Sequence, residues 1–423
     1  MTSVTHDFLQ RRRLFLFCGI LAAMAVGNGF FDGVLANYLR EVYAIDALQR
    51  GLIELPRELP GVLTVVLVST LMGLGDRRMG VIATILMLIG LLVLGFVTPP
   101  FAVMLVFLFI HSTGMHLWFP LDSSIGMSLI RDESRAGTVF SRFKAVSTAA
   151  GMLVSLLVFL GFNRGWFSFQ TKIKTVFLIG AAGIAVAMIL LLALERTHRE
   201  EARSGLAEKP ALQRPRFVFR LEYRFYYVLQ TMHGVQKQIM AVFAPWVLIT
   251  LLDQGADTLA LLALISSGIS IFFVPLVGQL LDRLGIRILV FIEAFTFISV
   301  YICFGVLAAG FIGGHLPKSG WAFYLTAALF VLDRLSMQLA MVHAMYLRSI
   351  AVSADDIAPA LSTGQAMDHV VSITMALASG WIWTTIGPQY VFFSAALLSL
   401  INAAVAFRIP RRSAANRRLE LSS

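Results

Sequence analysis

The sequence predicts an all-α membrane protein with twelve transmembrane helices in two pseudo-symmetric six-helix bundles. Three observations predict it: the composition suits lipid, twelve apolar runs are long enough to cross a bilayer, and the two halves of the chain repeat. Of the 423 residues, 58% are hydrophobic and 14% are charged. A soluble chain carries about 25% charged residues. Much of this surface is therefore expected to face lipid.

The apolar runs define the elements in order, because a helix needs about 20 residues to cross the hydrocarbon core. The predicted spans are 14–40, 47–73, 80–97, 101–129, 137–160, 173–194, 222–250, 258–279, 287–309, 321–346, 359–385 and 389–408. The first follows a basic N-terminus, but its apolar run is too long for a cleaved signal peptide and lacks a small-residue cleavage site. It is interpreted as a retained span.

Basic residues between the spans predict the orientation. They gather in alternate loops, at Arg11–Arg13, Arg77 and Arg78, Arg131 and Arg135, 195–221, Arg283 and Arg287, and Arg408–Arg418. The turns at 98–100 and 253–257 contain neither Lys nor Arg. By the positive-inside rule both termini are cytoplasmic. The net charge of +10 then requires no nucleic-acid partner. Arg164, Lys172 and Lys174, in a predicted outer loop, are exceptions to the pattern.

The longest hydrophilic stretch, at 195–221, predicts the domain organisation, because such a segment is solvated and separates packed units. We expect an N-terminal six-helix bundle over 1–194 and a cytoplasmic linker over 195–221. A C-terminal six-helix bundle over 222–410 and a cytoplasmic tail over 411–423 follow.

An internal repeat supports this division. "GLGDRRMG" stands near the end of the second span and "GQLLDRLGIR" near the end of the eighth, with Asp76 and Asp282 206 residues apart. That shift lays span one on span seven and span two on span eight. Two homologous halves explain the match, and such an arrangement places ligands near the membrane midplane between them.

At these motifs the chain resembles the major facilitator superfamily, over essentially its whole length. The second copy matches the family's GxxxDRxGxR pattern at Gly278, Asp282, Arg283, Gly285 and Arg287. The first copy keeps Asp76 and Arg77, whereas Gly73 and Gly80 are displaced by one position. The resemblance implies a gating role for these motif residues as two half-domains rock. The alternative is that Asp-Arg pairs at a membrane border only anchor the topology.

Charged residues inside the second span need a destination away from lipid. Glu54, Arg57 and Glu58 fall on one helical face. A charge at the span centre costs about 2.5–3.5 kcal/mol on insertion scales. If spans one and two turn near 43–44, Asp32 lies at the height of Arg57 and is its expected partner. A functional site is favoured, and a static ion-pair cluster is the alternative.

Other spans carry further candidates. The resemblance implies that the first, fourth, seventh and tenth helices line a central cavity, which directs Asp32, His116, Lys237, Asp333 and Arg334 inward. Gln238 adjoins Lys237, and Asp368 is a candidate proton site. Adjacent Asp368 and His369 point about 100° apart and are not expected to pair.

The histidines give two weaker expectations. His116 either lines the cavity or packs with a hydrogen bond, and its spacing from His111 argues against a shared metal site. We expect no metal and no cofactor. Asp122, Glu293 and His343 lie nearer the membrane borders, where snorkelling toward water is the favoured interpretation.

These features predict a secondary active transporter for a small polar or charged organic solute. No GxxxxGK[ST] loop is present, so ATP hydrolysis is not the energy source. Deep carboxylates (Asp32, Glu54, Glu58, Asp333, Asp368) outnumber deep bases (Arg57, Lys237, Arg334), which favours proton coupling. Export of a cation and import of an anion both remain open.

The expected setting is a monomer in a plasma or bacterial inner membrane, whose partners are the solute, protons and the lipid bilayer. The alternative function is a transporter-like receptor or scaffold that binds a ligand without net flux. An enzyme is disfavoured because the sequence shows no nucleophile–His–acid set and no metal-ligand spacing.

Overall fold

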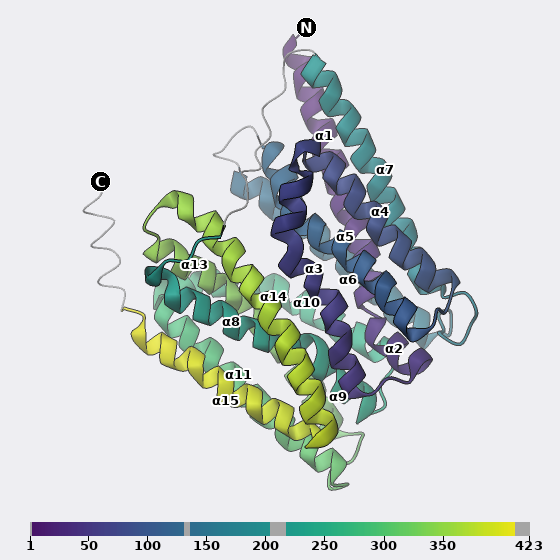
Figure 1. The fold of residues 1–423 in the computed structure, drawn as a ribbon, viewed down its shortest axis with the longest axis vertical. Coiled ribbons are helices and arrows are strands. Elements are labelled where there is room, and N and C mark those ends of the chain that lie inside the picture. Colours follow the sequence, from purple (N-terminus) through teal and green to yellow (C-terminus); the bar gives the residue numbers. More distant parts are fainter. Residues whose placement is uncertain (1, 131–135, 204–216, 411–423) are drawn as a thin grey trace. The chain divides into compact units, whose positions relative to one another are not determined.

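The computed structural model describes residues 2–130, 136–203 and 217–410, and helices account for nearly all of them (Figure 1). No strand occurs within these three ranges. Arg131 and Arg135, the centre of the predicted linker and the predicted tail lie outside the described residues.

Helices form at all twelve predicted spans. Most ends lie within five residues of the predicted ones, but α1 begins 12 residues earlier and α7 ends nine residues later. The first six are α1 (Thr2–Asp32) with α2 (Leu35–Tyr43), α3 (Ala47–Leu71), α4 (Asp76–Phe96), α5 (Phe101–Ser128), α6 (Ala136–Asn163) and α7 (Thr175–Arg203). The second six are α8 (Arg224–Gln238) with η4 (Ile239–Phe243) and α9 (Ala244–Thr250), α10 (Ala256–Leu284), α11 (Ile286–Ile312), α12 (Trp321–Ser336) with η5 (Met337–Ala340) and α13 (Met341–Ile350), α14 (Ala354–Thr385) and α15 (Pro388–Arg408). Short 3₁₀ turns are η1 (Met72–Leu74) and η3 (Leu221–Tyr223).

Hydropathy separates these helices into two kinds. Nine helices of the described ranges are long and apolar enough to cross a membrane on that measure alone. The predicted spans outside this set are α3, the α8–η4–α9 segment and α14. Each of the three carries ionisable side chains in its interior, and these side chains form the candidate site described below.

The chain divides into two compact units. Unit 1 comprises Met1–Tyr43 and Leu59–Pro215, and unit 2 comprises Ala44–Glu58 and Arg216–Ser423. One boundary falls inside α3, between Pro56 and Pro60, so the first half of this helix belongs to unit 2. Proline removes a backbone donor and weakens a helix at such a position. The separation of two bundles by a linker at 195–221 stays a prediction, as does the cytoplasmic placement of the termini.

The internal repeat is visible in the helix packing. In unit 1, α1 packs on α6 and α7, and α4 packs on α5 and α7. In unit 2, α8 packs on α14 and α15, and α11 packs on α12 and α15. When the six spans of each half are numbered in chain order, the first packs on the fifth and sixth in both halves. The third packs on the fourth and sixth in both. The two halves therefore share one packing plan.

Two of the unit 2 spans are interrupted near polar residues. After α8, the helix widens into a π turn at Ile239–Phe243, where the Ala244 amide donates to the Ile239 carbonyl. Pro245 follows and has no amide proton to offer. After α12, the helix tightens into the 3₁₀ turn Met337–Ala340. Such interruptions are frequent at functional sites.

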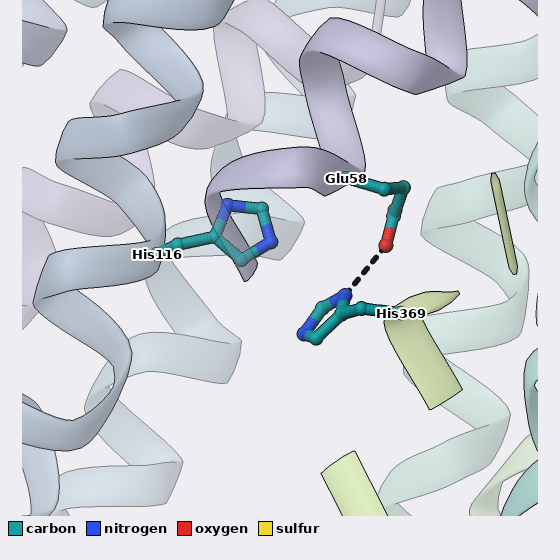
Figure 2. Close-up of side chains that lie close together, drawn as sticks. All are labelled: Glu58, His116 and His369. Carbon is teal, nitrogen blue, oxygen red and sulfur yellow. Dashed lines mark hydrogen bonds and ion pairs between the residues drawn. The ribbon is translucent and has the colours of Figure 1, made fainter. Parts of the chain in front are cut away.

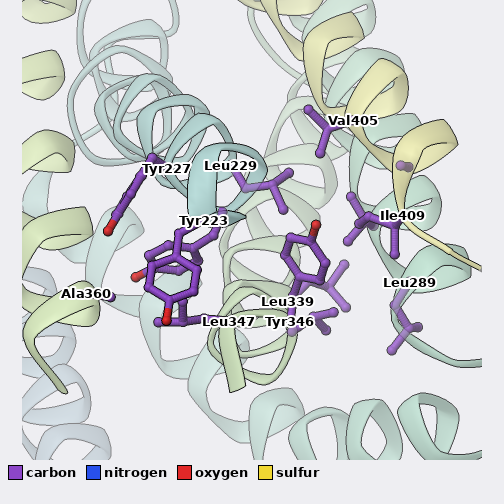
Figure 3. Packing of buried hydrophobic residues seen from close by; sticks show 14 of the residues in the cluster. Tyr223, Tyr227, Leu229, Leu289, Leu339, Tyr346, Leu347, Ala360, Val405 and Ile409 are labelled. Carbon is purple, nitrogen blue, oxygen red and sulfur yellow. The ribbon is translucent and has the colours of Figure 1, made fainter. Parts of the chain in front are cut away.

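The segment η3 and the first turns of α8 lie in a buried hydrophobic cluster of unit 2, which contains Tyr223, Tyr226, Tyr227 and Tyr346. Figure 3 shows Tyr223, Tyr227 and Tyr346 of this cluster. Tyr223 donates from its hydroxyl to Asp356 of α14 at 3.2 Å and accepts from the Val352 amide at 2.9 Å. Arg220 reaches the same Asp356 oxygen at 2.6 Å, and this bond raises the pKa of the exposed guanidinium. The segment before α8 is thereby fastened to the start of α14.

A buried lysine accounts for one exception to the basic-loop pattern. Lys174, just before α7, is buried, and its ammonium donates to Thr98 Oγ1 at 2.6 Å. Its backbone amide donates to the Gly95 carbonyl at 2.8 Å. Burial lowers the pKa of the Lys174 ammonium. Lys174 thus ties one loop of unit 1 to another, whereas Arg164 and Lys172 are exposed.

Candidate substrate and proton site

The backbones of α8 and α14 approach closely because both helices carry glycine at the contact. A Cβ placed on Gly234 would lie 2.6 Å from the Asp368 carbonyl oxygen, and one on Gly364 would lie 2.6 Å from the Tyr226 hydroxyl. The Ser372 hydroxyl donates to the Gly234 carbonyl at 3.3 Å. Small residues allow this approach in membrane helices. The contact fixes Asp368 against the middle of α8.

The first half of α3 packs on α14 by the same means. A Cβ on Gly51 would lie 2.3 Å from the Ala376 carbonyl oxygen, and one on Gly380 would lie 2.7 Å from the Ala47 carbonyl oxygen. Asp46 caps the start of α3: its carboxylate accepts from the Gln49 amide at 2.8 Å, and its own amide donates to Gln49 Oε1 at 3.1 Å. These contacts bring the charged face of α3 beside α14 within unit 2.

Four ionisable side chains meet at this junction, and we call them the Lys237 cluster: Glu58, Lys237, Asp368 and His369. The Lys237 ammonium lies 2.7 Å from Asp368 Oδ2 and 3.0 Å from Glu58 Oε2. His369 Nδ1 lies 2.6 Å from Glu58 Oε2, and Figure 2 shows the imidazole directed at this carboxylate. The cluster is mostly buried, with 22% of the Lys237 side chain exposed and 9% of the Asp368 side chain.

A second ion-pair group lies one turn away along α3. Glu54 Oε1 accepts from Arg50 at 2.6 Å and from Arg57 at 2.7 Å. Both Arg50 and Glu54 are only 2% exposed. Glu54 therefore has two guanidinium partners on its own helix, one of which, Arg50, was not among the predicted site residues. The predicted pairing of Arg57 with Asp32 stays a prediction.

Asp333 is fully buried in α12. Its Oδ1 accepts from the Tyr301 hydroxyl at 3.3 Å, while Oδ2 makes no hydrogen bond within the described part of the chain. Arg334 is half-buried and lies over the Phe330 ring, with 5.7 Å between its Cζ and the ring centroid. Gln238 is buried, and its amide oxygen makes no hydrogen bond in the same described part.

The predicted substrate or proton residues of unit 1 outside α3 are Asp32 and His116. Asp32 is the last residue of α1 and its side chain is exposed. His116 is buried in α5, and its Nδ1 lies 3.0 Å from Ser112 Oγ. His111 donates from Nδ1 to the Met87 carbonyl at 3.0 Å and packs on the Phe31 ring. These contacts place the two imidazoles against different groups, and the expectation that they share no metal site stays a prediction.

The two copies of the gating motif differ in structure. Asp76 is the first residue of α4 and accepts a short hydrogen bond from the Ser124 hydroxyl. Asp282 instead lies exposed in the last turn of α10. The aspartates that match under the sequence shift are thus not equivalent in the two turns.

Two glycines of the motif regions serve the turns between helices. Gly75 has φ 80° and ψ 154° before α4, and Gly285 has φ 81° and ψ 165° between α10 and α11. Residues with a Cβ rarely adopt this backbone conformation. A Cβ on Gly278, by contrast, would meet no described atom within 4 Å.

The arginines of the motif have local surroundings. Arg77 is half-buried and Arg283 is exposed, while Arg287 lies over the Phe291 ring, with 5.9 Å between its Cζ and the ring centroid. A role in gating stays a prediction for all of these motif residues.

Besides Arg50, two features of unit 2 were not predicted from the sequence. His369 was considered only as a neighbour of Asp368, although a histidine beside an acid on a charged helix is itself a signal. Glu293 and His343 were expected nearer the membrane borders. Their side chains are each 1% exposed, so they do not snorkel.

Comparison with known proteins now identifies the class. The chain matches the family model of the Major Facilitator Superfamily over residues 15–367. It belongs to this superfamily, and is therefore a multi-pass integral membrane transporter and not an enzyme. No curated protein matches it in sequence.

Solved structures of transporters share the fold. A mutant of the nucleoside transporter NupG has a TM-score of 0.72 and 16% identity, with 93% of this chain and 99% of that chain covered. A POT family transporter in complex with 5-aminolevulinic acid has a TM-score of 0.72 and 12% identity, covering 94% and 96%. A D-xylose-proton symporter has a TM-score of 0.62 and 14% identity, covering 93% and 96%. At these identities the similarity concerns the fold alone.

Proposed function

We propose that the protein moves a small polar or charged organic solute across the membrane by alternating access, coupled to protons. The Lys237 cluster carries the proposal. It gathers two carboxylates, an ammonium and an imidazole among helices of a membrane protein. Ionisable groups are expensive in such a place and typically mark transport or proton pathways.

The charge of the cluster depends on one proton. With Glu58 and Asp368 ionised, Lys237 charged and His369 neutral, the net charge is −1. His369 Nδ1 donates to the Glu58 carboxylate in this state, because a carboxylate can only accept. A second proton, on Nε2, brings the net charge to zero and turns this hydrogen bond into an ion pair. Proton uptake therefore changes how strongly Glu58 holds Lys237. This link between proton and ion pair is the basis of the proposed coupling.

A solute would act on the same contacts. An anionic solute competes with Glu58 and Asp368 for the Lys237 ammonium, while a cationic solute competes with Lys237 for the carboxylates. Either exchange displaces a charged side chain from its buried pair, which is costly unless the displaced group changes its protonation or gains another partner. Because the two cases differ in the sign of the solute, a ligand screen separates them.

The test begins with binding. Purified protein is screened by thermal unfolding against nucleosides, D-xylose, 5-aminolevulinic acid and short peptides, a panel taken from the compounds named for proteins of this fold. A ligand that binds only the folded state raises the free energy of unfolding by about 2.7 kcal/mol at a concentration of 100 times Kd. The unfolding temperature rises as a result.

Flux in liposomes follows for each compound that binds. We expect uptake that depends on a pH gradient and that Lys237→Ala abolishes. The matched control is Lys318→Ala, because Lys318 pairs with Asp253 at 2.7 Å but both side chains are exposed. Binding without flux in any condition would favour a receptor. Equal flux with and without the gradient would contradict proton coupling.

A further inference from the structure

A second buried group in unit 2 lies apart from the Lys237 cluster. Glu293 of α11 and His343 of α13 are each 1% exposed, and His343 Nε2 lies 2.8 Å from Glu293 Oε2. The other ring nitrogen, Nδ1, lies 3.2 Å from Gln230 Oε1 of α8. Two helices, α8 and α11, thus each supply one oxygen atom to an imidazole carried by a third helix, α13.

The hydrogen bonds require a shared proton. Gln230 Oε1 can only accept, so His343 Nδ1 donates to it. The short Nε2–Oε2 contact then holds a second proton, on either the ring or the carboxyl group. In both arrangements the pair is neutral overall. Loss of this proton leaves one negative charge in a buried place, where an uncompensated charge is costly.

The carboxyl group is not fixed as firmly as a purely structural pair would be. Glu293 Oε1 makes no hydrogen bond within the described residues. Replacing a buried ion pair by apolar residues is often neutral or stabilising. A buried pair between two membrane helices with one carboxylate oxygen left without a hydrogen bond therefore adds little to the free energy of unfolding. This argues for a role in proton binding.

Neighbouring groups connect this pair to the Lys237 cluster. His233 of α8 lies edge-on to His343, with 6.1 Å between ring centroids, and its Nδ1 makes no hydrogen bond in the described ranges. Along α8, Gln230, His233 and Lys237 share one face through spacings of three and four residues.

We propose that Glu293 and His343 form a proton-binding site that takes up and releases one proton during transport. The inference rests on the proposed function, since it supplies a site for the coupled proton. His233 is an ionisable neighbour of the pair, with 6.1 Å between its ring centroid and that of His343. The pair belongs entirely to unit 2, so its chemistry depends only on contacts within that unit.

Histidine NMR tests the site without a transported solute. The protein is labelled with ¹⁵N at its 8 histidines and placed in lipid nanodiscs. The ¹⁵N shifts of His343, assigned by the loss of signal in His343→Gln, report which ring nitrogens carry protons. We expect a one-proton transition of the pair between about pH 5 and about pH 9. His343 shifts that stay constant over this interval would overturn the proposal.

A variant of the carboxyl partner sharpens the result. Glu293→Gln removes the negative charge beside the ring but keeps a hydrogen-bonding side chain. We expect the midpoint of the His343 transition to change, because the ring no longer shares a proton with a carboxyl group. His315→Gln, in an exposed loop, should leave the transition in place. An unaltered midpoint in Glu293→Gln would contradict the shared proton. If that variant does not fold, the titration of the unmodified protein decides alone.

These outcomes are separate from those of the transport assay. A titrating His343 in a protein that moves no compound in any condition would contradict the proposed function and leave the proton site standing. Proton-coupled flux with a His343 that never titrates would keep the function and remove this site.

Discussion

The Lys237 ammonium lies 2.7 Å from Asp368 Oδ2, and this contact joins α8 to α14 inside unit 2. The same ammonium reaches Glu58 of α3 at 3.0 Å. One side chain therefore links three helices, and these are the helices that fall outside the apolar spans. Four predictions follow from this arrangement and from the close helix contacts around it.

Removing the ammonium should reveal the repulsion between its two partners. We expect Lys237→Ala to lower the unfolding temperature, since Glu58 and Asp368 lose their shared counter-ion; the cost is on the order of 3 kcal/mol. Adding Asp368→Asn should recover part of the loss, because only one carboxylate then remains charged at the junction. Thermal unfolding of the single and double variants measures the coupling. Strictly additive losses would show that the two side chains do not interact.

Glu54 should matter more for stability than Arg57. Glu54→Gln deprives buried Arg50 of its carboxylate, so we expect a loss of about 3–5 kcal/mol and little folded protein. Arg57→Ala leaves the Arg50–Glu54 pair in place and should give a folded protein that does not transport. Yield and unfolding temperature check the first expectation, and flux checks the second. The control is Arg78→Ala, whose exposed pair with Glu195 is worth less than about 1 kcal/mol.

The α3–α14 contact should not accept a methyl group. In Gly51→Ala the added carbon would lie 2.3 Å from the Ala376 carbonyl oxygen, so the helices must separate at a cost of about 1–3 kcal/mol. Gly278→Ala is the matched control, because its added carbon would meet no described atom within 4 Å and alanine favours the helix by about 0.5–1 kcal/mol. Equal unfolding temperatures for the two variants would contradict the close contact.

The turn glycines should resist substitution for a backbone reason. Gly285→Ala forces alanine into φ 81° and ψ 165°, which costs about 1–3 kcal/mol. Gly75→Ala should behave alike, since φ there is 80°. Both are compared with Gly278→Ala by thermal unfolding. If Gly285→Ala unfolds at the temperature of the unmodified protein, its role in the motif is not that of a turn residue.

The spans could be predicted from sequence because hydropathy and length are local properties. Even α3 and α14 were found, since their flanking apolar residues outweigh Glu58 or Asp368. The inward placement of charged residues followed from the cost of exposing them to lipid. The presence of Lys237, Asp368 and Glu58 among the candidates was therefore predictable.

The pairing of these side chains could not be predicted in the same way. Glu58 and His369 are 311 positions apart, and nothing local in either sequence specifies their contact. The exposure of Glu293 and His343 was wrongly predicted from their position along the span. A side chain near a membrane border is buried whenever a neighbouring helix covers it. The different positions of Asp76, at the start of α4, and Asp282, in the last turn of α10, could not be predicted either. A matching motif does not specify where a helix begins or ends.

Proton movement driven by the solute tests the central claim most directly. Liposomes containing the protein and trapped pyranine receive a compound identified by the thermal screen, with no pH gradient imposed at the start. The account predicts a change of internal pH that begins with solute addition, is absent in Lys237→Ala and is retained in Lys318→Ala. Solute uptake at an unchanged internal pH, or an equal pH change in Lys237→Ala, would contradict it.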